Sequence, residues 1–352
     1  MLRLEKAGPA KATLSRRGLL GAAPAAALAA CDTGLQVTAS RTPKLDMEGL
    51  NESIGEIARR AMPGRLGVGL LNMDGGEAFT LNGDQRFPMQ SVFKLPLAAA
   101  VLAEVDAGRV LLAERLFLLE EQLSGQHSPI ALAWPGRRDY SAEELLWATV
   151  VDSDNTAADV LMKRIGGPGA VTAWLVSRRV TEVRVDRYER ELQPEHYGMP
   201  SFRPEWRTGA AFAKAREAVP PAARLAAMRA YMADPRDTAT PRGMVEFLQK
   251  LDRRELVSAA STERLLKLMA ATPRAAGRLK AGLPKDAFFA HRPGTSGEHQ
   301  GISTAHNDVG IFTLADKRSY AIAGFLSGST LDEAGRDAIL ADVARAAVNG
   351  VA

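Results

Sequence analysis

Strand-like segments stand at both ends of this chain, and a long, mostly helical stretch separates them. Residues 64–82 have the pattern of two strands around a glycine-rich turn, and residues 286–327 hold three further strand candidates. Helical periodicity dominates residues 88–282 and returns at about 331–348. Strands so far apart bury a common face most simply in one sheet. We therefore expect an α+β fold, with a sheet built from both chain ends and an inserted helical subdomain.

The first 31 residues have the pattern of an export signal. "SRRGLLGAAPAAALAAC" contains an arginine pair followed by a short, alanine-rich apolar stretch, which is too short to form a stable membrane span. The arginine pair is typical of a Tat-type signal. "LAAC", ending at Cys31, resembles a bacterial lipobox, in which the cysteine becomes the lipidated first residue. The alternative is a plain signal peptide with an incidental cysteine.

Charge and cysteine content exclude some classes for the remainder. Residues 1–31 carry a net charge of +4, which equals the net charge of the whole chain, so residues 32–352 are neutral overall. A neutral body gives no global attraction to nucleic acid or to an anionic membrane. Cys31 is the only cysteine, so no internal disulfide is possible and the fold must depend on its core.

Three short motifs in a particular order indicate serine chemistry. Ser91 and Lys94, in "SVFK", are spaced to share one helix face. "SDN" at 153–155 lies between two helical segments, and "HRPGTSG" at 291–297 enters a C-terminal strand. A hydrolase that uses lysine in place of histidine needs a nucleophilic serine, a proton-accepting lysine and a second hydroxyl. Each motif alone is common by chance, and the order is what carries the inference.

From about residue 47 to 350 the chain resembles the class A β-lactamases. Their signature combines Ser-x-x-Lys, Ser-Asp-Asn and Lys-Thr-Gly. The likeness extends to "RFPMQSVFKLPLAAAVLAEVDAG", "VVDSDNTAADVLMKRIGGP", "VDRYERELQ" and "RDTATPRGM". The resemblance implies an α/β/α sandwich whose sheet has five antiparallel strands. It also implies hydrolysis of the β-lactam amide through an acyl-serine intermediate.

The resemblance assigns roles residue by residue. Ser91 would be acylated, with Lys94 taking part in its activation, and Ser153 would pass a proton to the leaving nitrogen. Asn155 would hold Lys94 and the side-chain amide of the substrate. The backbone N–H groups of Ser91 and Thr295 would form the oxyanion hole. Asp154 is expected to be structural.

Glu189 decides whether the acyl-enzyme is hydrolysed. It matches the loop base of the family, two residues after Arg187, while Glu191 is expected to be a loop salt-bridge partner. Gln193 stands where the family usually has asparagine to hold the hydrolytic water. The extra methylene of glutamine could make that placement less exact.

Arg187 and Asp237 match the ion pair that closes the omega loop of the family. Here 49 residues separate the pair, so the loop, about 187–237, is enlarged. The extra tract, 198–233, includes "PAARLAAMRAYMADP", which has helical spacing. It is either a surface decoration or a lid over the site.

The substrate-binding residues show two departures from the family. Arg292 replaces lysine and keeps a charge whose guanidinium can fork onto a carboxylate. Pro293 replaces threonine and supplies neither hydroxyl nor N–H, although the Thr295 hydroxyl, on the same strand face, could cover part of the loss. His127 aligns with an aromatic residue at the mouth of the site.

We therefore predict an exported class A serine β-lactamase with no cofactor and no metal. The expected arrangement is a signal segment (1–31), a tether (32–45) and one catalytic domain (46–352). β-Lactams are the expected partners. We expect no nucleic-acid partner and a monomer. The Tat-type signal predicts export to the periplasm, where a lipid on Cys31 would be the only membrane contact. The alternative is a slow or non-hydrolysing penicillin-binding protein, or a D,D-peptidase of related fold; peptidases of that kind lack the base at Glu189.

Overall fold

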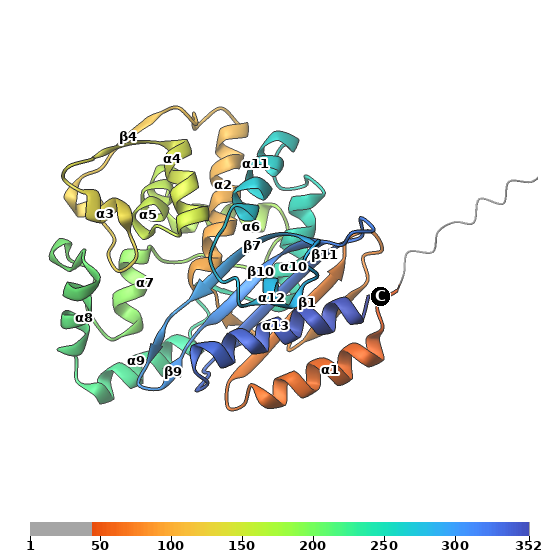
Figure 1. The fold of residues 1–352 in the computed structure, drawn as a ribbon. Helices are drawn as coiled ribbons and strands as arrows, with labels where there is room; N and C mark the ends of the chain where they lie inside the picture. The colour runs from red at the N-terminus through yellow and green to blue at the C-terminus, as the bar shows by residue number, and fades with distance from the viewer. Residues whose placement is uncertain (1–43, 352) are drawn as a thin grey trace, which may run out of the picture. The chain divides into compact units, whose positions relative to one another are not determined.

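The computed structural model describes residues 44–351, and a five-stranded antiparallel sheet forms its centre (Figure 1). The strands lie in the order β2-β1-β11-β10-β7. Their bounds are β1, Arg65–Asn72; β2, Ala78–Leu81; β7, Phe288–Thr295; β10, His306–Thr313; and β11, Ser319–Ser327. The prediction of one sheet that joins both ends of the chain is confirmed, because β1 pairs with β11 from Arg65↔Ser327 to Asn72↔Tyr320.

Two helices from opposite ends of the domain cover one face of the sheet. Helix α1 (Met47–Arg60) packs beside α13 (Glu333–Asn349), as Figure 1 shows. Each begins at an aspartate, Asp46 or Asp332, whose side chain accepts a backbone N–H of the first turn. Side chains of alternate strand residues meet these helices in one buried cluster, which includes Leu50, Ile54, Val68, Leu70, Ile322, Leu340 and Val343.

Helix α10 (Pro241–Asp252) lies against the other face, and glycines permit its close approach. A Cβ at Gly69 would lie 2.7 Å from the carbonyl oxygen of Pro241, and one at Gly67 would meet the ring of Phe87 at 2.5 Å. A larger residue at either position would push the helix off the sheet.

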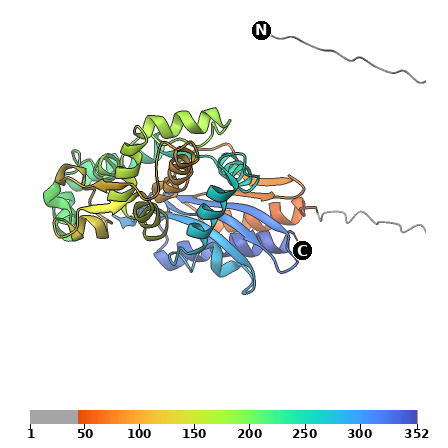
Figure 2. The same ribbon diagram turned by 90° about the horizontal axis from the view of Figure 1, so that it is seen from above.

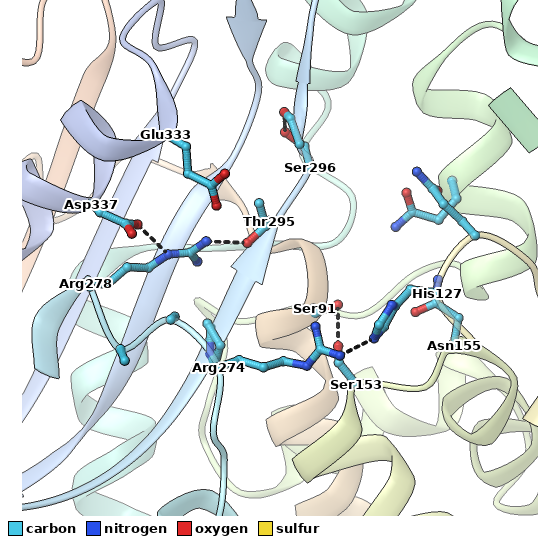
Figure 3. A pocket seen from close by; sticks show the side chains of 17 residues that line it. Ser91, His127, Ser153, Asn155, Arg274, Arg278, Thr295, Ser296, Glu333 and Asp337 are labelled. Carbon is cyan, nitrogen blue, oxygen red and sulfur yellow. Dashed lines mark hydrogen bonds and ion pairs between the residues drawn. The ribbon is translucent and has the colours of Figure 1, made fainter. Parts of the chain in front are cut away.

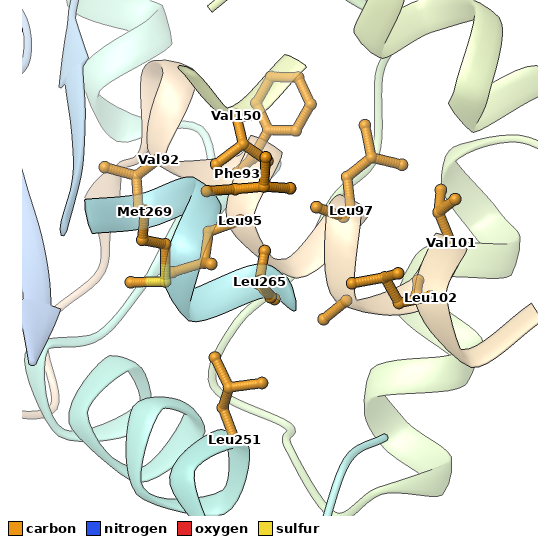
Figure 4. Close-up of a cluster of buried hydrophobic side chains, with 14 of the residues drawn as sticks. Val92, Phe93, Leu95, Leu97, Val101, Leu102, Val150, Leu251, Leu265 and Met269 are labelled. Carbon is orange, nitrogen blue, oxygen red and sulfur yellow. The ribbon is translucent and has the colours of Figure 1, made fainter. Parts of the chain in front are cut away.

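The helical part lies beyond this second face and surrounds α2 (Lys94–Asp106). In Figure 2 its yellow and green helices lie to one side of the sheet. Every residue of α2 from Lys94 to Leu102 is buried, and apolar neighbours such as Leu251, Leu265 and Met269 surround the helix (Figure 4). The other helices are α3, Pro129–Ala133; α4, Ala142–Trp147; α5, Asn155–Arg164; α6, Pro168–Ser177; α7, Glu189–His196; α8, Gly209–Glu217; α9, Pro221–Ala233; α11, Ala259–Ala270; and α12, Leu279–Gly282. Single turns connect some of them: η1, Gln90–Phe93; η2, Glu120–Gln122; η3, Ala148–Asp152; and η4, Pro204–Trp206.

The sequence predicted an inserted part made only of helices, but the structure shows short strands there as well. Short strands β4 (Arg115–Phe117) and β5 (Asp139–Ser141) pair within it, and β3 (Phe87–Pro88) pairs with β6 (Thr238–Ala239) at its border. A further pair, β8 (Glu298–His299) and β9 (Ile302–Ser303), forms a small hairpin after β7. Strands of two or three residues leave almost no alternating pattern in a sequence, which is why they were not predicted.

The extra tract at 198–233 packs against the helical part of the domain instead of decorating its surface. Its helix α9 was predicted, but the tract also has a hydrophobic cluster of its own. Phe202, Phe212 and Met228 are buried there, and Tyr231 is only 5% exposed. The cluster also takes in Leu123 from the helical part, so the tract is packed into the domain.

The packed region begins slightly earlier than the predicted tether boundary. Leu45 is buried, and its N–H donates to a Glu77 oxygen at 2.7 Å. In the stretch from 44 to 351, none of the helices has the length and apolar character needed to cross a membrane. The predicted signal segment and Cys31 lie outside the described residues.

Candidate active site

Ser91 and Lys94 meet at a change of helix type. Ser91 lies in the 3-10 turn η1, and Lys94 is the first residue of α2. In a 3-10 turn, side chains three residues apart eclipse each other. Lys94 Nζ is consequently 3.2 Å from Ser91 Oγ, the pairing that the spacing predicted.

Strand β7 passes very close to this turn, at the edge of the sheet. A Cβ at Gly294 would lie 2.3 Å from the Met89 carbonyl oxygen and 2.9 Å from the Val92 nitrogen. Only glycine lets the strand run so near the serine. Pro293 fits here because an edge strand tolerates the loss of one N–H donor.

Lys94 is fully buried at the centre of the site. Its Nζ lies 2.6 Å from Asn155 Oδ1, 2.8 Å from the Ser153 carbonyl oxygen and 2.9 Å from Glu189 Oε1. Burial lowers the pKa of Lys94, with the Glu189 carboxylate acting in the opposite direction. A lysine with a lowered pKa, within reach of a serine hydroxyl, is suited to accept its proton.

Ser153 reaches the nucleophile from a strained turn. The π-helical turn η3 ends at Ser153, which has a φ of 62°, a left-handed value that is uncommon outside glycine. Its Oγ donates to Ser91 Oγ at 3.1 Å. Asp154 is structural: it caps α5 at Ala157 and accepts bonds from Ser128 Oγ and the Ile130 N–H.

Arg292 lies behind the pocket instead of lining it, in contrast to the carboxylate contact inferred from sequence. It is fully buried, and its Nε and Nη1 donate to the carbonyl oxygens of Ser91 (2.9 Å) and Val150 (2.7 Å). Its Nη2 bonds the Ser153 hydroxyl. Burial lowers the pKa of Arg292 to about 9. Because Arg292 is fully buried and each of its three nitrogens donates to the protein, its guanidinium orients the two serines and does not reach the pocket.

Glu189 opens helix α7 on the far side of Lys94. It is 1% exposed; its Oε1 faces Lys94 and its Oε2 accepts the Gln193 amide at 2.8 Å. Glu191, expected to form a loop salt bridge, accepts the backbone N–H of Tyr188 at 3.1 Å and caps the helix. Of the two carboxylates, Glu189 is therefore the one directed at the catalytic groups.

The predicted ion pair between Arg187 and Asp237 closes the loop that carries Glu189. The Arg187 Nε is 2.6 Å from Asp237 Oδ2, and both side chains are buried. Burial raises the pKa of Asp237 to about 6, against the pull of Arg187. Removing one member of such a buried pair typically costs about 3–5 kcal/mol.

A pocket of 580 Å³ opens over Ser91, in the usual size range for small-molecule sites (Figure 3). The lining includes six residues singled out from the sequence: Ser91, His127, Ser153, Asn155, Gln193 and Thr295. Pro293 also lines it. Lys94, Glu189 and Arg292 are not part of the lining, although they contact residues that are.

Two arginines at one side of the pocket were missed by sequence reasoning. The Arg278 Nη2 donates to Thr295 Oγ1 at 2.7 Å, and its Nε faces Asp337 at 3.2 Å (Figure 3). Arg274 reaches across the pocket to His127. Nothing in "TPRAAGRLKAG" distinguishes these arginines from surface residues, because their position depends on how the loop after α11 crosses β7.

His127 lines the pocket, which agrees with the expectation from the family resemblance. Its Nε2 is 2.7 Å from an Arg274 nitrogen and 2.9 Å from the Asp152 carbonyl oxygen. Burial lowers the pKa of His127. Both contacts are made by the same ring nitrogen, which donates to the carbonyl oxygen when it carries a proton and accepts from Arg274 when it does not.

Asp159 supports Glu189 from beneath and was also missed. Its oxygens accept the backbone N–H groups of Glu189 (2.7 Å) and Arg190 (3.0 Å) and the Ser124 hydroxyl. Burial raises the pKa of Asp159 to about 7, and the Glu189 charge adds to the effect. The carboxylate thus fixes the first turn of α7.

The raised pKa of Asp159 predicts how the stability of the fold depends on pH. Between about pH 4 and pH 7, folded Asp159 holds a proton that the unfolded chain has lost, so stability falls as pH rises through this range. Asparagine does not titrate. From pH 5 to pH 8, wild type should therefore lose more free energy of unfolding than Asp159→Asn. Urea unfolding at both pH values measures this, and equal losses would contradict the assignment.

Among residues 44–351, no group of three or more His, Cys, Asp or Glu side chains is arranged to hold a metal ion. The polar lining of the pocket around Ser91 consists of serines, amides and basic side chains, and the carboxylates of Glu333 and Asp337 lie beside Arg278 at its other end. Such a set can activate a serine, transfer protons and hold an anion.

Comparisons with known proteins agree with this chemistry. A profile of the "Beta-lactamase enzyme family" matches residues 49–351. The chain is 31% identical to β-lactamase L2 of Stenotrophomonas maltophilia over 82% of both chains, and 29% identical to β-lactamase VEB-1 of Pseudomonas aeruginosa over 81% of this chain and 85% of that protein. Among solved structures, an ancestral class A β-lactamase matches with a TM-score of 0.69 at 33% identity, covering 85% of this chain and 99% of that one. A β-lactamase from Chitinophaga pinensis matches with a TM-score of 0.70 at 30% identity, covering 84% and 97%.

Proposed function

The chain belongs to the class A β-lactamase family, and we propose that it opens the β-lactam amide bond through an acyl intermediate on Ser91. It is a serine β-lactamase, and its substrates are β-lactams of the penicillin and cephalosporin type. This is the chemistry of β-lactam antibiotic resistance. The residue roles below rest on the geometry of the site.

Acylation begins with the Ser91 hydroxyl. Lys94 Nζ, 3.2 Å away, accepts its proton while Ser91 Oγ bonds to the β-lactam carbonyl carbon. The carbonyl oxygen becomes an oxyanion, for which the backbone N–H groups of Ser91 and Thr295 are the proposed donors. When the C–N bond breaks, the Ser153 hydroxyl gives a proton to the nitrogen and regains one from Lys94, which lies 3.4 Å away.

Deacylation uses the carboxylate of Glu189. It removes a proton from a water molecule whose oxygen attacks the ester carbon. The ester bond to Ser91 breaks, the proton held by Glu189 returns to Ser91 Oγ through Lys94, and the opened acid leaves. Gln193, at 2.8 Å from Glu189 and in the pocket lining, is the proposed second contact of that water.

The substrate carboxylate is proposed to bind at Thr295 and the missed arginines. Pro293 offers no hydroxyl, and Arg292 is fully buried and absent from the pocket lining. The Thr295 hydroxyl, which accepts from Arg278, has its own proton free to donate. Arg274 and Arg278 supply positive charge in the same pocket.

One observation carries the assignment: Lys94 Nζ lies between Ser91 Oγ and Glu189 Oε1, at 3.2 and 2.9 Å. The nucleophile that is acylated, Ser91, and the base for hydrolysis, Glu189, are therefore connected through one lysine in the same site. The test is steady-state hydrolysis of a chromogenic cephalosporin by the purified protein. Many turnovers per molecule are expected. A burst of one equivalent with no further product would instead identify a slow penicillin-binding protein.

For location, we propose Tat-dependent export to the periplasm, with a lipid on Cys31 as the only membrane attachment. The arginine pair at 16–17 and "LAAC" at 28–31 support this proposal. We also propose that the enzyme acts as a monomer. It is expected to have no nucleic-acid partner, since residues 32–352 carry no net charge.

Lipidation at Cys31 has a direct test in the producing cell. Labelled fatty acid should be incorporated into the wild-type protein and absent from Cys31→Ser, because no other cysteine exists in the chain. Immunoprecipitation followed by detection of the label measures this. Equal labelling of the two proteins, or none in either, would contradict the proposal.

A further inference from the structure

The inserted tract reaches the catalytic centre through one side chain. Tyr231, on α9, is 5% exposed, and its hydroxyl accepts the Gln90 side-chain amide at 2.8 Å. Gln90 directly precedes Ser91 and is 1% exposed. The insertion therefore contacts the residue next to the nucleophile, beneath the pocket.

From Gln90 a chain of side-chain amides leads to Glu189. The Gln193 Nε2 donates both to Gln90 Oε1 (2.9 Å) and to Glu189 Oε2 (2.8 Å). Tyr231, Gln90, Gln193 and Glu189 are thus connected without a break, through groups that are at most 8% exposed.

When Glu189 is ionised, the donors and acceptors of this hydrogen-bond chain can be arranged in one direction only. A carboxylate can only accept, so Gln193 must present its NH₂ group to it. The same NH₂ group also faces Gln90, which must then present its oxygen. The Gln90 NH₂ group consequently points to Tyr231, whose hydroxyl is the acceptor that ends the chain. With this orientation the Gln193 carbonyl oxygen is left for the pocket that the residue lines.

We propose that Tyr231 is a positioning residue for deacylation. By accepting the Gln90 amide, it holds Gln90 and Gln193 so that Gln193 keeps its NH₂ on Glu189 and its oxygen toward the hydrolytic water. This inference rests on the proposed function, in which Glu189 activates that water. It also gives the insertion a role in the reaction that is distinct from limiting substrate entry.

Tyr231 is itself held by the residues that close the loop. The Arg187 guanidinium lies 5.8 Å from the centre of its ring, and Arg187 in turn bonds Asp237. The ring of His196, on α7, packs 4.5 Å from it on a tilted plane. A hydroxyl fixed in this way can hold a neighbouring amide in one orientation.

The test is Tyr231→Phe, which removes the acceptor and keeps the ring. Quenched-flow mass spectrometry with a penicillin measures acylation and deacylation separately. Deacylation should slow about three- to tenfold, the range expected for loss of one buried hydrogen bond, while acylation changes less than twofold. Met228→Leu, a buried change on the same helix that does not touch the amide chain, should leave both rates unchanged.

A second variant makes the assignment specific. Gln90→Met breaks the same chain, so adding Tyr231→Phe to it should slow deacylation no further. Additive effects, equal slowing of both steps, or wild-type deacylation in Tyr231→Phe would each overturn the proposal. If Tyr231→Phe does not fold, an unchanged deacylation rate in Gln90→Met overturns it and a slowed rate supports it. Failure of the wild type to turn over would instead refute the proposed function.

Discussion

Ser91→Ala is expected to gain no mass on exposure to a penicillin, whereas the wild type gains one adduct. The alanine keeps the turn but removes the atom that lies 3.2 Å from Lys94 and 3.1 Å from Ser153. Loss of the nucleophile in a serine hydrolase lowers kcat on the order of 10⁶-fold. Intact-protein mass spectrometry of briefly exposed samples, together with steady-state rates, measures both effects.

A second pocket serine provides the control. Ser296 lines the same pocket, but its hydroxyl bonds the Gly297 carbonyl oxygen and the backbone N–H groups of Thr304 and Ala305. Ser296→Ala should therefore still form the adduct. An adduct on Ser91→Ala, located by peptide mapping at any other residue, would contradict the role of Ser91.

Glu189→Gln is expected to acylate and then remain acylated. The amide keeps the size of the side chain and can still meet Lys94 or Gln193 with its oxygen, but it cannot take a proton from water. General-base catalysis contributes about 10²–10⁴-fold, so kcat should fall by that factor. The acyl-enzyme, scarce in wild type, should become the main species in mass spectra during turnover.

Glu191→Gln is the matched control for this change. Glu191 stands two residues further along α7 and accepts the Tyr188 N–H, away from Lys94. A glutamine oxygen can accept the same bond, so turnover should stay near that of wild type. If Glu191→Gln accumulates acyl-enzyme and Glu189→Gln does not, the base has been assigned to the wrong carboxylate.

Most of the fold could be predicted because its elements are long and periodic. Strands β1, β7, β10 and β11 are runs of eight or nine mostly buried residues, and helices α1 and α13 have helical periodicity. The resemblance then implied the antiparallel five-stranded sheet, which the structure confirms. The paired short strands β4 and β5 could not be predicted, since three residues carry too little periodicity.

The site could be predicted as far as its motifs extend. The motifs correctly predicted which residues meet at the site: Ser91, Lys94, Ser153 and Glu189. The motif could not show that the Arg292 side chain turns away from the pocket. A motif gives the residue type and its position on the strand, whereas the packing around a long side chain decides where its charged group lies. Arg278 was missed for the same reason.

The role of the insertion was beyond sequence reasoning. Tyr231 is separated by 141 positions from Gln90, its hydrogen-bond partner, and no motif links them. The helical spacing of the inserted tract predicted α9, but it did not predict the surface against which α9 packs. Contacts between an inserted tract and the site beside it depend on how that particular tract packs.

The pairing of β1 with β11 has a consequence for how the molecule forms. These strands stand about 260 positions apart in the chain, yet they are neighbours at the centre of the sheet. Until β11 has been synthesised, β1 has only β2 as a partner, and a two-stranded hairpin is marginally stable in water. Contacts so distant in sequence raise the contact order, and folding slows accordingly. The sheet is therefore completed only after the last strand has left the ribosome, and a nascent chain released before residue 319 has no route to the native state.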